Sequence, residues 1–240
     1  MTAPAFDYSN LSDRPTGPVL RTLSALLPGV RRVQDQVTPW ARAWEAHNRR
    51  VLAQEGPIWV ALGDSMTQGI GASAPERGWA GQLSERLTGA GWDHRLVNLS
   101  VSGARVEDVL DRQLPALDSA LAASGAGDAA LVTVVIGSND IVAARHRDGL
   151  VERFAQMLDR LPPGSVVANL PNPRREARAV DTLLRERAAD GRLVLADMRE
   201  EGPRSWRGRL AADLFHPNDL GYADMATVVG SALDRAGLPG

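Results

Sequence analysis

Three side chains of this sequence have the types and spacing needed to make a serine nucleophilic. Ser65 ends the run Ile58-Trp59-Val60-Ala61-Leu62-Gly63-Asp64-Ser65, in which an apolar segment stops at a Gly-Asp-Ser turn. Far downstream, Asp213 and His216 lie three residues apart. A serine hydroxyl needs a neighbouring imidazole to attack at neutral pH, and a carboxylate orients that imidazole. The pattern therefore predicts a triad of Ser65, His216 and Asp213.

Two further segments offer hydrogen-bond donors for a developing oxyanion. They are Asn98-Leu99-Ser100-Val101-Ser102-Gly103 and Gly137-Ser138-Asn139-Asp140, and each closes an apolar run. Gly103 lets a backbone N–H approach a carbonyl without a Cβ in the way, and the amide of Asn139 can donate to the same oxygen. Gly and Asn are also common turn residues, so neither segment is decisive by itself.

Taken in order, these four segments resemble the blocks of the SGNH (GDSL-type) hydrolase family. The block that follows His216, Pro217-Asn218-Asp219-Leu220-Gly221-Tyr222, resembles the family's closing block. Met66 stands where the family usually has Leu, a swap that nearly conserves volume and should leave the side chain packed inward. The resemblance covers roughly residues 57–236.

The resemblance implies a three-layer α/β/α fold with a flavodoxin-like parallel sheet of about five strands. It also implies an esterase or lipase that cleaves carboxylic esters through an acyl-enzyme and needs no cofactor. Ser65, Asp213 and His216 would be catalytic. The oxyanion hole would consist of the backbone N–H groups of Ser65 and Gly103 and the side chain of Asn139. The substrate would be a small acyl ester, although neither its acyl group nor its alcohol follows from these motifs.

Alternation of short β-branched runs with longer amphipathic stretches after residue 57 independently predicts βαβ units and a parallel sheet covered on both faces. We expect strands at 59–62, 95–101, 130–136, 166–170 and 193–197, and helices at 79–90, 106–117, 150–161, 175–189 and 220–236. This arrangement places Ser65 at the carboxyl edge of the sheet, where such folds bind ligands.

Residues 1–56 form a different region, which we interpret as an N-terminal helical arm on a hydrolase domain of residues 57–240. Its helical patterns break around Pro28-Gly29 and Thr38-Pro39. One face carries Trp40, Trp44, His47 and Val51, whereas Arg42, Glu45 and Arg49 lie off that face. The arm also holds the apolar residues Val19, Leu20, Leu23, Leu27 and Val30. Packing on the domain is expected, and dimerisation through the arm or contact with lipid is the alternative.

Several other sites are disfavoured by the sequence. The run Gly69-Ile70-Gly71-Ala72-Ser73-Ala74 fits a dinucleotide pattern, but it is displaced from the strand end and no acidic residue ends the second strand. A phosphate-binding loop needs Lys, which the chain lacks. The four histidines are scattered, which disfavours a metal site. Asp140 is the chief rival carboxylate, and Asp64 is expected to order its own turn.

Composition sets broader limits. The chain has 240 residues, 44% of them hydrophobic, a net charge of -2 and no Cys. These values indicate no nucleic-acid partner and exclude disulfides and thiolate chemistry. No apolar run approaches the ~20 residues of a membrane span, and the N-terminus lacks the pattern of a secretory signal, so a cytoplasmic location is expected. A non-catalytic module that binds lipid or a partner on the same fold remains the alternative function; the intact triad residues argue against it.

Overall fold

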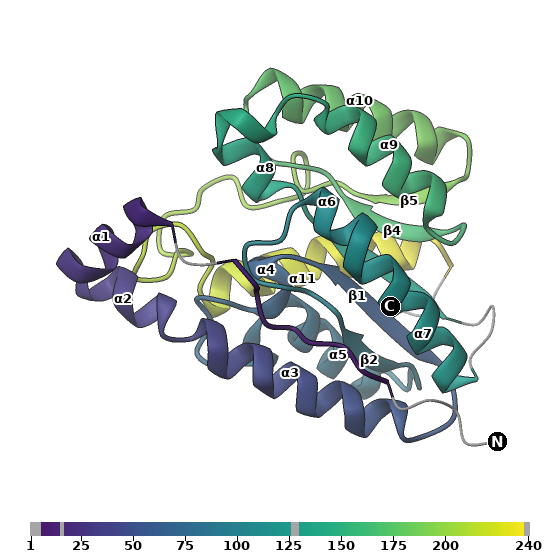
Figure 1. Ribbon diagram of the computed structural model, residues 1–240. Coiled ribbons are helices and arrows are strands. Elements are labelled where there is room, and N and C mark those ends of the chain that lie inside the picture. The colour runs from purple at the N-terminus through teal and green to yellow at the C-terminus, as the bar shows by residue number, and fades with distance from the viewer. Residues whose placement is uncertain (1–5, 15–16, 126–129, 238–240) are drawn as a thin grey trace.

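The computed structural model describes residues 6–14, 17–125 and 130–237, apart from the side chains of residues 18–21, and it contains a five-stranded parallel sheet (Figure 1). The strands are β1 (Ile58–Gly63), β2 (Arg95–Asn98), β3 (Leu131–Val135), β4 (Ser165–Ala168) and β5 (Leu193–Ala196). They lie in the order β2-β1-β3-β4-β5, and every neighbouring pair is parallel. This is the flavodoxin-like order, so the predicted fold class is confirmed.

Helices cover both faces of the sheet because the central strands are apolar on both sides. Ile58, Val60 and Leu62 pack toward one cluster, whereas Trp59 and Ala61 pack toward the other. The first cluster is closed by α7 (Leu114–Ser124), α9 (Leu150–Arg160) and α10 (Arg175–Ala189), and the second by α5 (Trp79–Gly89) and α11 (Asp219–Arg235). Short helices α4 (Ser65–Gln68), α6 (Val106–Asp108) and α8 (Ser138–Val142) follow β1, β2 and β3.

The predicted elements match the observed ones closely, with two informative differences. The helix expected at 106–117 is interrupted by a π-helical segment, Val109–Gln113, and then runs on to Ser124. Pro115 explains the interruption, because its ring nitrogen cannot donate to the preceding turn. The second strand ends at Asn98, although Leu99 N–H and Val101 N–H still donate to carbonyls of β1.

The N-terminal region contains α1 (Pro18–Leu26), α2 (Pro28–Gln34) and α3 (Val37–Leu52). The break at Pro28 is confirmed, but Pro39 lies in the first turn of α3, where its missing N–H costs nothing. Among the apolar arm residues, Val30 is buried while Leu23 and Leu27 are exposed, and the side chains of Val19 and Leu20 lie outside the described residues.

Helix α3 runs beside the edge strand β2 (Figure 1). Trp44 Nε1 donates to the Gln68 carbonyl at 3.0 Å, Trp40 Nε1 donates to the Gly69 carbonyl at 3.2 Å, and a ring nitrogen of His47 lies 2.9 Å from the Leu96 carbonyl. The expected face of α3 therefore packs on the sheet region. The domain boundary at residues 56 and 57 stays a prediction. Within the described ranges, no helix is long and apolar enough to cross a bilayer.

Candidate active site

Ser65 is the first residue of α4, directly beyond the carboxyl end of β1. Asp64 caps this helix, and its Oδ1 accepts a hydrogen bond from Met66 N–H at 2.9 Å. Only glycine fits at position 63, because a Cβ there would lie 2.3 Å from the Val135 carbonyl oxygen. The Gly-Asp-Ser turn thus follows from close packing against β3 on one side and from a carboxylate cap on the other.

The backbone just before Ser65 is held by a side chain that the sequence did not reveal. Gln113, in the π-helical segment, accepts from Gly63 N–H through Oε1 and donates to the Gly63 carbonyl through Nε2, both at 2.8 Å. Gln113 is fully buried. Its amide therefore binds the main chain of Gly63 as a neighbouring strand would. These two bonds hold the backbone in place two residues before Ser65.

Asp213 and His216 are brought together by a tight turn. Asp213 Oδ1 accepts from the N–H groups of Phe215 and His216 at 3.1 Å each, and Oδ2 lies 2.6 Å from His216 Nδ1. Leu214, between them, has a φ of 57°, the sole positive φ at a non-glycine residue in the described part of the chain. A left-handed Leu is strained by about 1–2 kcal/mol, and such strain is found mainly at functional sites.

The imidazole reaches the serine hydroxyl. His216 Nε2 lies 3.0 Å from Ser65 Oγ, and both side chains are buried. Burial acts to raise the pKa of the Asp213 carboxyl, but the hydrogen bond and charge of His216 and two backbone N–H groups together hold that pKa below its usual range. Asp213 is therefore an anion at neutral pH, as a carboxylate that orients an imidazole must be.

Contacts between the segment after Ser65 and the segment after His216 keep the two side chains in place. The buried Tyr222 hydroxyl donates to the Ile70 carbonyl at 2.6 Å, and Asp219 accepts from the N–H and hydroxyl of Ser73. A Cβ at Gly71 would lie 2.8 Å from His216 Cβ, so the two segments touch.

The two predicted oxyanion residues lie on the loops after β2 and β3. Gly103 has a φ of 78°, which favours glycine, and a Cβ there would have no atom within 4 Å. Asn139 Nδ2 donates to the Ala104 carbonyl at 2.9 Å and has a longer contact, 3.4 Å, with Asp64 Oδ2. The first bond occupies one amide hydrogen and fixes the side chain beside the Gly103 loop.

The rival carboxylates have other partners. Asp140 Oδ2 accepts from Val106 N–H at 3.2 Å, and burial raises the pKa of Asp140 to about 6. Asp64 orders its own turn, as expected, and burial raises its pKa to about 7 although Met66 N–H and His216 act to lower it. Within the described residues, no three His, Asp or Glu side chains gather closely enough to hold a metal ion.

An apolar cavity of about 310 Å³ is lined by sequence neighbours of the predicted triad residues Ser65 and His216. Its wall includes Met66, the residue after Ser65, and Leu214, Phe215 and Pro217, the neighbours of His216. Other lining residues come from the carboxyl ends of β3, β4 and β5, from the loops that follow them and from α8: Val135, Ile136, Ser138, Ile141, Val142, Ala168, Asn169, Leu170, Pro171, Asn172 and Met198. Pro203, Trp206, Leu210 and Met225 complete the lining. Met66 is half-buried: it packs against the second hydrophobic cluster, as expected, and it also forms part of the wall of this cavity.

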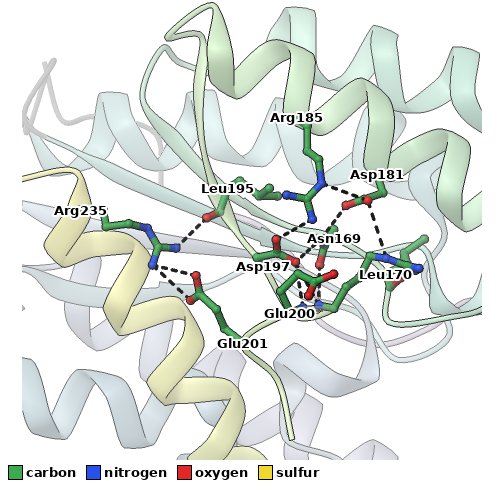
Figure 2. A network of polar contacts seen from close by, with 10 residues as sticks. Asn169, Leu170, Asp181, Arg185, Leu195, Asp197, Glu200, Glu201 and Arg235 are labelled. Atoms are coloured by element: carbon green, nitrogen blue, oxygen red, sulfur yellow. Dashed lines mark hydrogen bonds and ion pairs between the residues drawn. The ribbon is translucent and has the colours of Figure 1, made fainter. Parts of the chain in front are cut away.

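A charged network supports the far wall of the cavity (Figure 2). Asn169 Nδ2 donates at 2.7 Å to both Asp181 and Asp197, and Arg185 binds the same two carboxylates. Arg199 Nη1 donates to the carbonyls of Leu170 and Asn172 at 2.8 Å each. These bonds fix the loop 169–172 after β4, which has no regular structure of its own.

Comparison with known proteins identifies one family. Residues 61–223 match the GDSL-like Lipase/Acylhydrolase family. Esterase TesA of Pseudomonas aeruginosa is 31% identical over 165 residues, which are 66% of this chain and 78% of that protein. A crystal structure of TesA has a TM-score of 0.57 and 25% identity, and the match covers 75% of this chain and 99% of the other.

More distant structures share the fold. A family 3 carbohydrate esterase of Clostridium thermocellum superposes with a TM-score of 0.54 at 18% identity, over 77% of this chain and all of that one. The fold, the Gly-Asp-Ser turn and the match over more than half of the sequence lead to one assignment: the chain belongs to the GDSL-like lipase/acylhydrolase family of esterases and lipases.

Proposed function

We propose that this protein is a serine esterase in which Ser65 is the nucleophile, His216 the general base and Asp213 the residue that orients His216. The observation that carries the proposal is the row of two short contacts, 2.6 Å from Asp213 to His216 and 3.0 Å from His216 to Ser65. An imidazole held on one side by a carboxylate and on the other by a serine hydroxyl is arranged for proton transfer.

In the first step, Ser65 Oγ attacks the ester carbonyl carbon while its proton passes to His216 Nε2. The carbonyl oxygen becomes an oxyanion, for which the N–H groups of Ser65 and Gly103 and the side-chain amide of Asn139 are the donors; the Asn139 hydrogen involved is the one that makes the long 3.4 Å hydrogen bond to Asp64 Oδ2 in this structure. Collapse of this intermediate breaks the bond to the alcohol, which takes the proton from His216. Water then attacks the acyl-enzyme by the same route and releases the acid.

The cavity beside the triad supports an apolar acyl chain as the part of the substrate that is recognised. The acyl group stays covalently bound to Ser65 after the alcohol has left, so it needs a place next to Met66 and Phe215. The lining consists mostly of aliphatic, aromatic and thioether groups, which bind through buried area, with Ser138, Asn169 and Asn172 as its polar members.

A panel of p-nitrophenyl esters of increasing acyl length tests both parts of the proposal, with Ser65→Ala as the control. We expect kcat/KM to rise with chain length by about fourfold per buried methylene, which corresponds to ~0.8 kcal/mol, until the cavity is filled. Equal turnover by the Ser65→Ala protein would refute the esterase assignment. A flat dependence on chain length, with Ser65 still essential, would refute only the role of the cavity.

A further inference from the structure

The first described residues of the chain, 6–14, form an extended segment that we call the N-terminal strap. It precedes α1 and crosses the edge of the sheet at β2 (Figure 1, purple). The family match begins at residue 61, so the strap lies outside the part of the chain that this family shares. Tyr8, whose hydroxyl donates to the Leu99 carbonyl at 2.6 Å, ties the strap to the residues that follow β2.

Asn10 is the centre of the strap's contacts and is completely buried. Its Nδ2 donates to the carbonyls of Asn98 and Ser100 at 2.9 and 2.8 Å. Its Oδ1 accepts from Asn48 of α3 at 3.3 Å. Because β2 is the edge strand, these carbonyls have no neighbouring strand on that side, and Asn10 supplies the donors that a strand would provide.

The same residue reaches the helix that carries Ser65. The Asn10 main-chain carbonyl accepts from Gln68 Nε2 at 2.8 Å, and this amide also donates to the Ser100 carbonyl at 3.0 Å. Gln68 is the last residue of α4 and is fully buried. Asn10 therefore joins α4, which begins at Ser65, to the segment that leads from β2 to Gly103.

Arg14 continues the strap to the Gly103 loop itself. Its Nη1 lies 3.3 Å from the Gly103 carbonyl and 2.5 Å from Asp108 Oδ2. Asp108 belongs to α6, which starts shortly after Gly103, and its Oδ2 also accepts from Arg105 N–H at 2.7 Å. The carbonyl that Arg14 binds belongs to the residue whose N–H is a proposed oxyanion donor, so Arg14 limits rotation of the Gly103 backbone.

From these contacts we propose that the N-terminal strap positions the oxyanion hole, with Asn10 and Arg14 as positioning residues. This inference rests on the proposed function, because it assumes that the N–H groups of Ser65 and Gly103 bind the oxyanion. Oxyanion donors act by being held in place before charge develops, and small displacements reduce their effect. The strap connects the two backbone segments that present these donors and does not itself touch the substrate.

The test compares four strap variants in the full-length protein: Arg14→Ala, Arg14→Lys, Asn10→Asp and Ser9→Ala. Arg14→Ala removes the bond to Gly103 at a partly exposed site, so the fold is expected to persist. Asn10→Asp keeps the shape of the side chain but removes both of its N–H donors. Ser9→Ala is the matched control, because the hydrogen bonds of Ser9 Oγ are with Glu45 at 2.6 Å and with Leu11 N–H at 3.2 Å, and neither partner belongs to the segment from β2 to Gly103.

Ester hydrolysis is measured per active site, with sites counted by fluorophosphonate titration, and Tm is measured alongside. We expect kcat to fall about 10-fold for Arg14→Ala and up to about 100-fold for Asn10→Asp, with KM changed less than threefold, because a complete oxyanion donor is worth about 10²–10³ in kcat. Ser9→Ala should keep wild-type kcat, and Arg14→Lys should recover part of the loss.

A lower Tm for Arg14→Ala and Asn10→Asp with unchanged kcat per titrated site would show that the strap only stabilises the fold, and would overturn the inference. If Asn10→Asp does not fold, Arg14→Ala and Arg14→Lys decide the question without it. Full activity of Ser65→Ala would instead overturn the proposed function. The two failures are therefore distinguishable.

Discussion

The two sides of Ser65 are built from different kinds of interaction. On the side of β2, buried amides such as Asn10, Gln68 and Gln113 bind main-chain groups at 2.8–3.0 Å. On the side of β4 and β5, an apolar cavity lies next to the triad and charged groups lie behind it. Hydrogen bonds are directional and suit donors that must not move, whereas apolar contact depends on area and suits chains of different length.

The two sides also differ in how they relate to the part of the chain that matches the family. Apart from Met225, the cavity residues and the proposed triad lie within residues 61–223, as do Gln68 and Gln113, whereas Asn10 and the rest of the strap precede them. Changes on the β2 side should therefore alter kcat, and changes on the cavity side should alter the preference among substrates. The predictions below test this division, starting with the largest expected effect.

After the loss of Ser65 or His216, a change of the proposed orienting carboxylate should have the largest effect. Asp213→Asn should lower kcat by roughly 10⁴-fold, because an amide no longer holds the imidazole in the correct tautomer. Asp140→Asn is the matched control, since Asp140 accepts from Val106 N–H and should change kcat less than 10-fold. Steady-state kinetics on one ester measure both. The triad assignment is wrong if the Asp140 change is the more damaging.

Removal of the side-chain oxyanion donor comes next. Asn139→Ala should lower kcat by about 10²–10³-fold with a much smaller change in KM, because the donor acts on charge that exists only in the transition state. The measurement is kcat and KM on a short-chain ester. An increase in KM with kcat unchanged would place Asn139 in substrate binding instead.

On the cavity side, a polar substitution at the rim should change chain-length preference only. Val142 lines the cavity and is 60% exposed, so Val142→Ser should fold normally. We expect it to reduce the ratio of kcat/KM for long and short esters about 3- to 10-fold, the equivalent of about 1 kcal/mol. Leu220→Ser, an exposed apolar residue outside this cavity, is the control. Equal ratios in the two variants would exclude the cavity from acyl binding.

The smallest effect concerns stability and pH. The pKa of Asp140 is about 6 in the fold, above about 3.8 for an exposed carboxyl, because burial disfavours the charge. The unfolded chain therefore loses this proton first, and the contribution of Asp140 to stability falls as pH rises from about 4 to 6. Asp140→Asn lacks this decline. Urea denaturation should show that the free energy of unfolding of the variant rises relative to that of the wild type between pH 4 and pH 7. A constant difference between the two free energies would contradict the raised pKa.

The sequence predicted much of the fold because strand ends and turn residues coincide. Strand β1 is an uninterrupted apolar run that must stop at Gly63, and the alternation of elements after it required a parallel sheet. Asp213 and His216 were recognisable because their bond forms within one turn and needs no distant partner. The triad candidates were therefore local patterns joined by the fold.

The residues that hold the backbone around Ser65 could not be predicted, because they act on groups that lie far away in the sequence. Asn10, Gln68 and Gln113 bind backbone carbonyls and N–H groups that are distant in sequence, and such partners leave no pattern of residue types. Glu45 illustrates the same limit, since it was expected off the packed face of α3 but is buried and accepts a hydrogen bond from Ser9 of the strap. The path of the strap across β2 explains the positions of Asn10, Gln68 and Glu45, whereas Gln113 is held by its two bonds to Gly63.

The most direct test of the central claim, that Ser65 is the nucleophile activated by His216, is to map the adduct of a fluorophosphonate by peptide mass spectrometry. The reagent reacts with serines whose proton is taken by a neighbouring base. We expect one adduct per chain, on Ser65, with labelling absent in Ser65→Ala and strongly slowed in His216→Ala, while Asn139→Ala still labels. An adduct on another serine, or labelling that persists in the Ser65→Ala protein, would contradict the account.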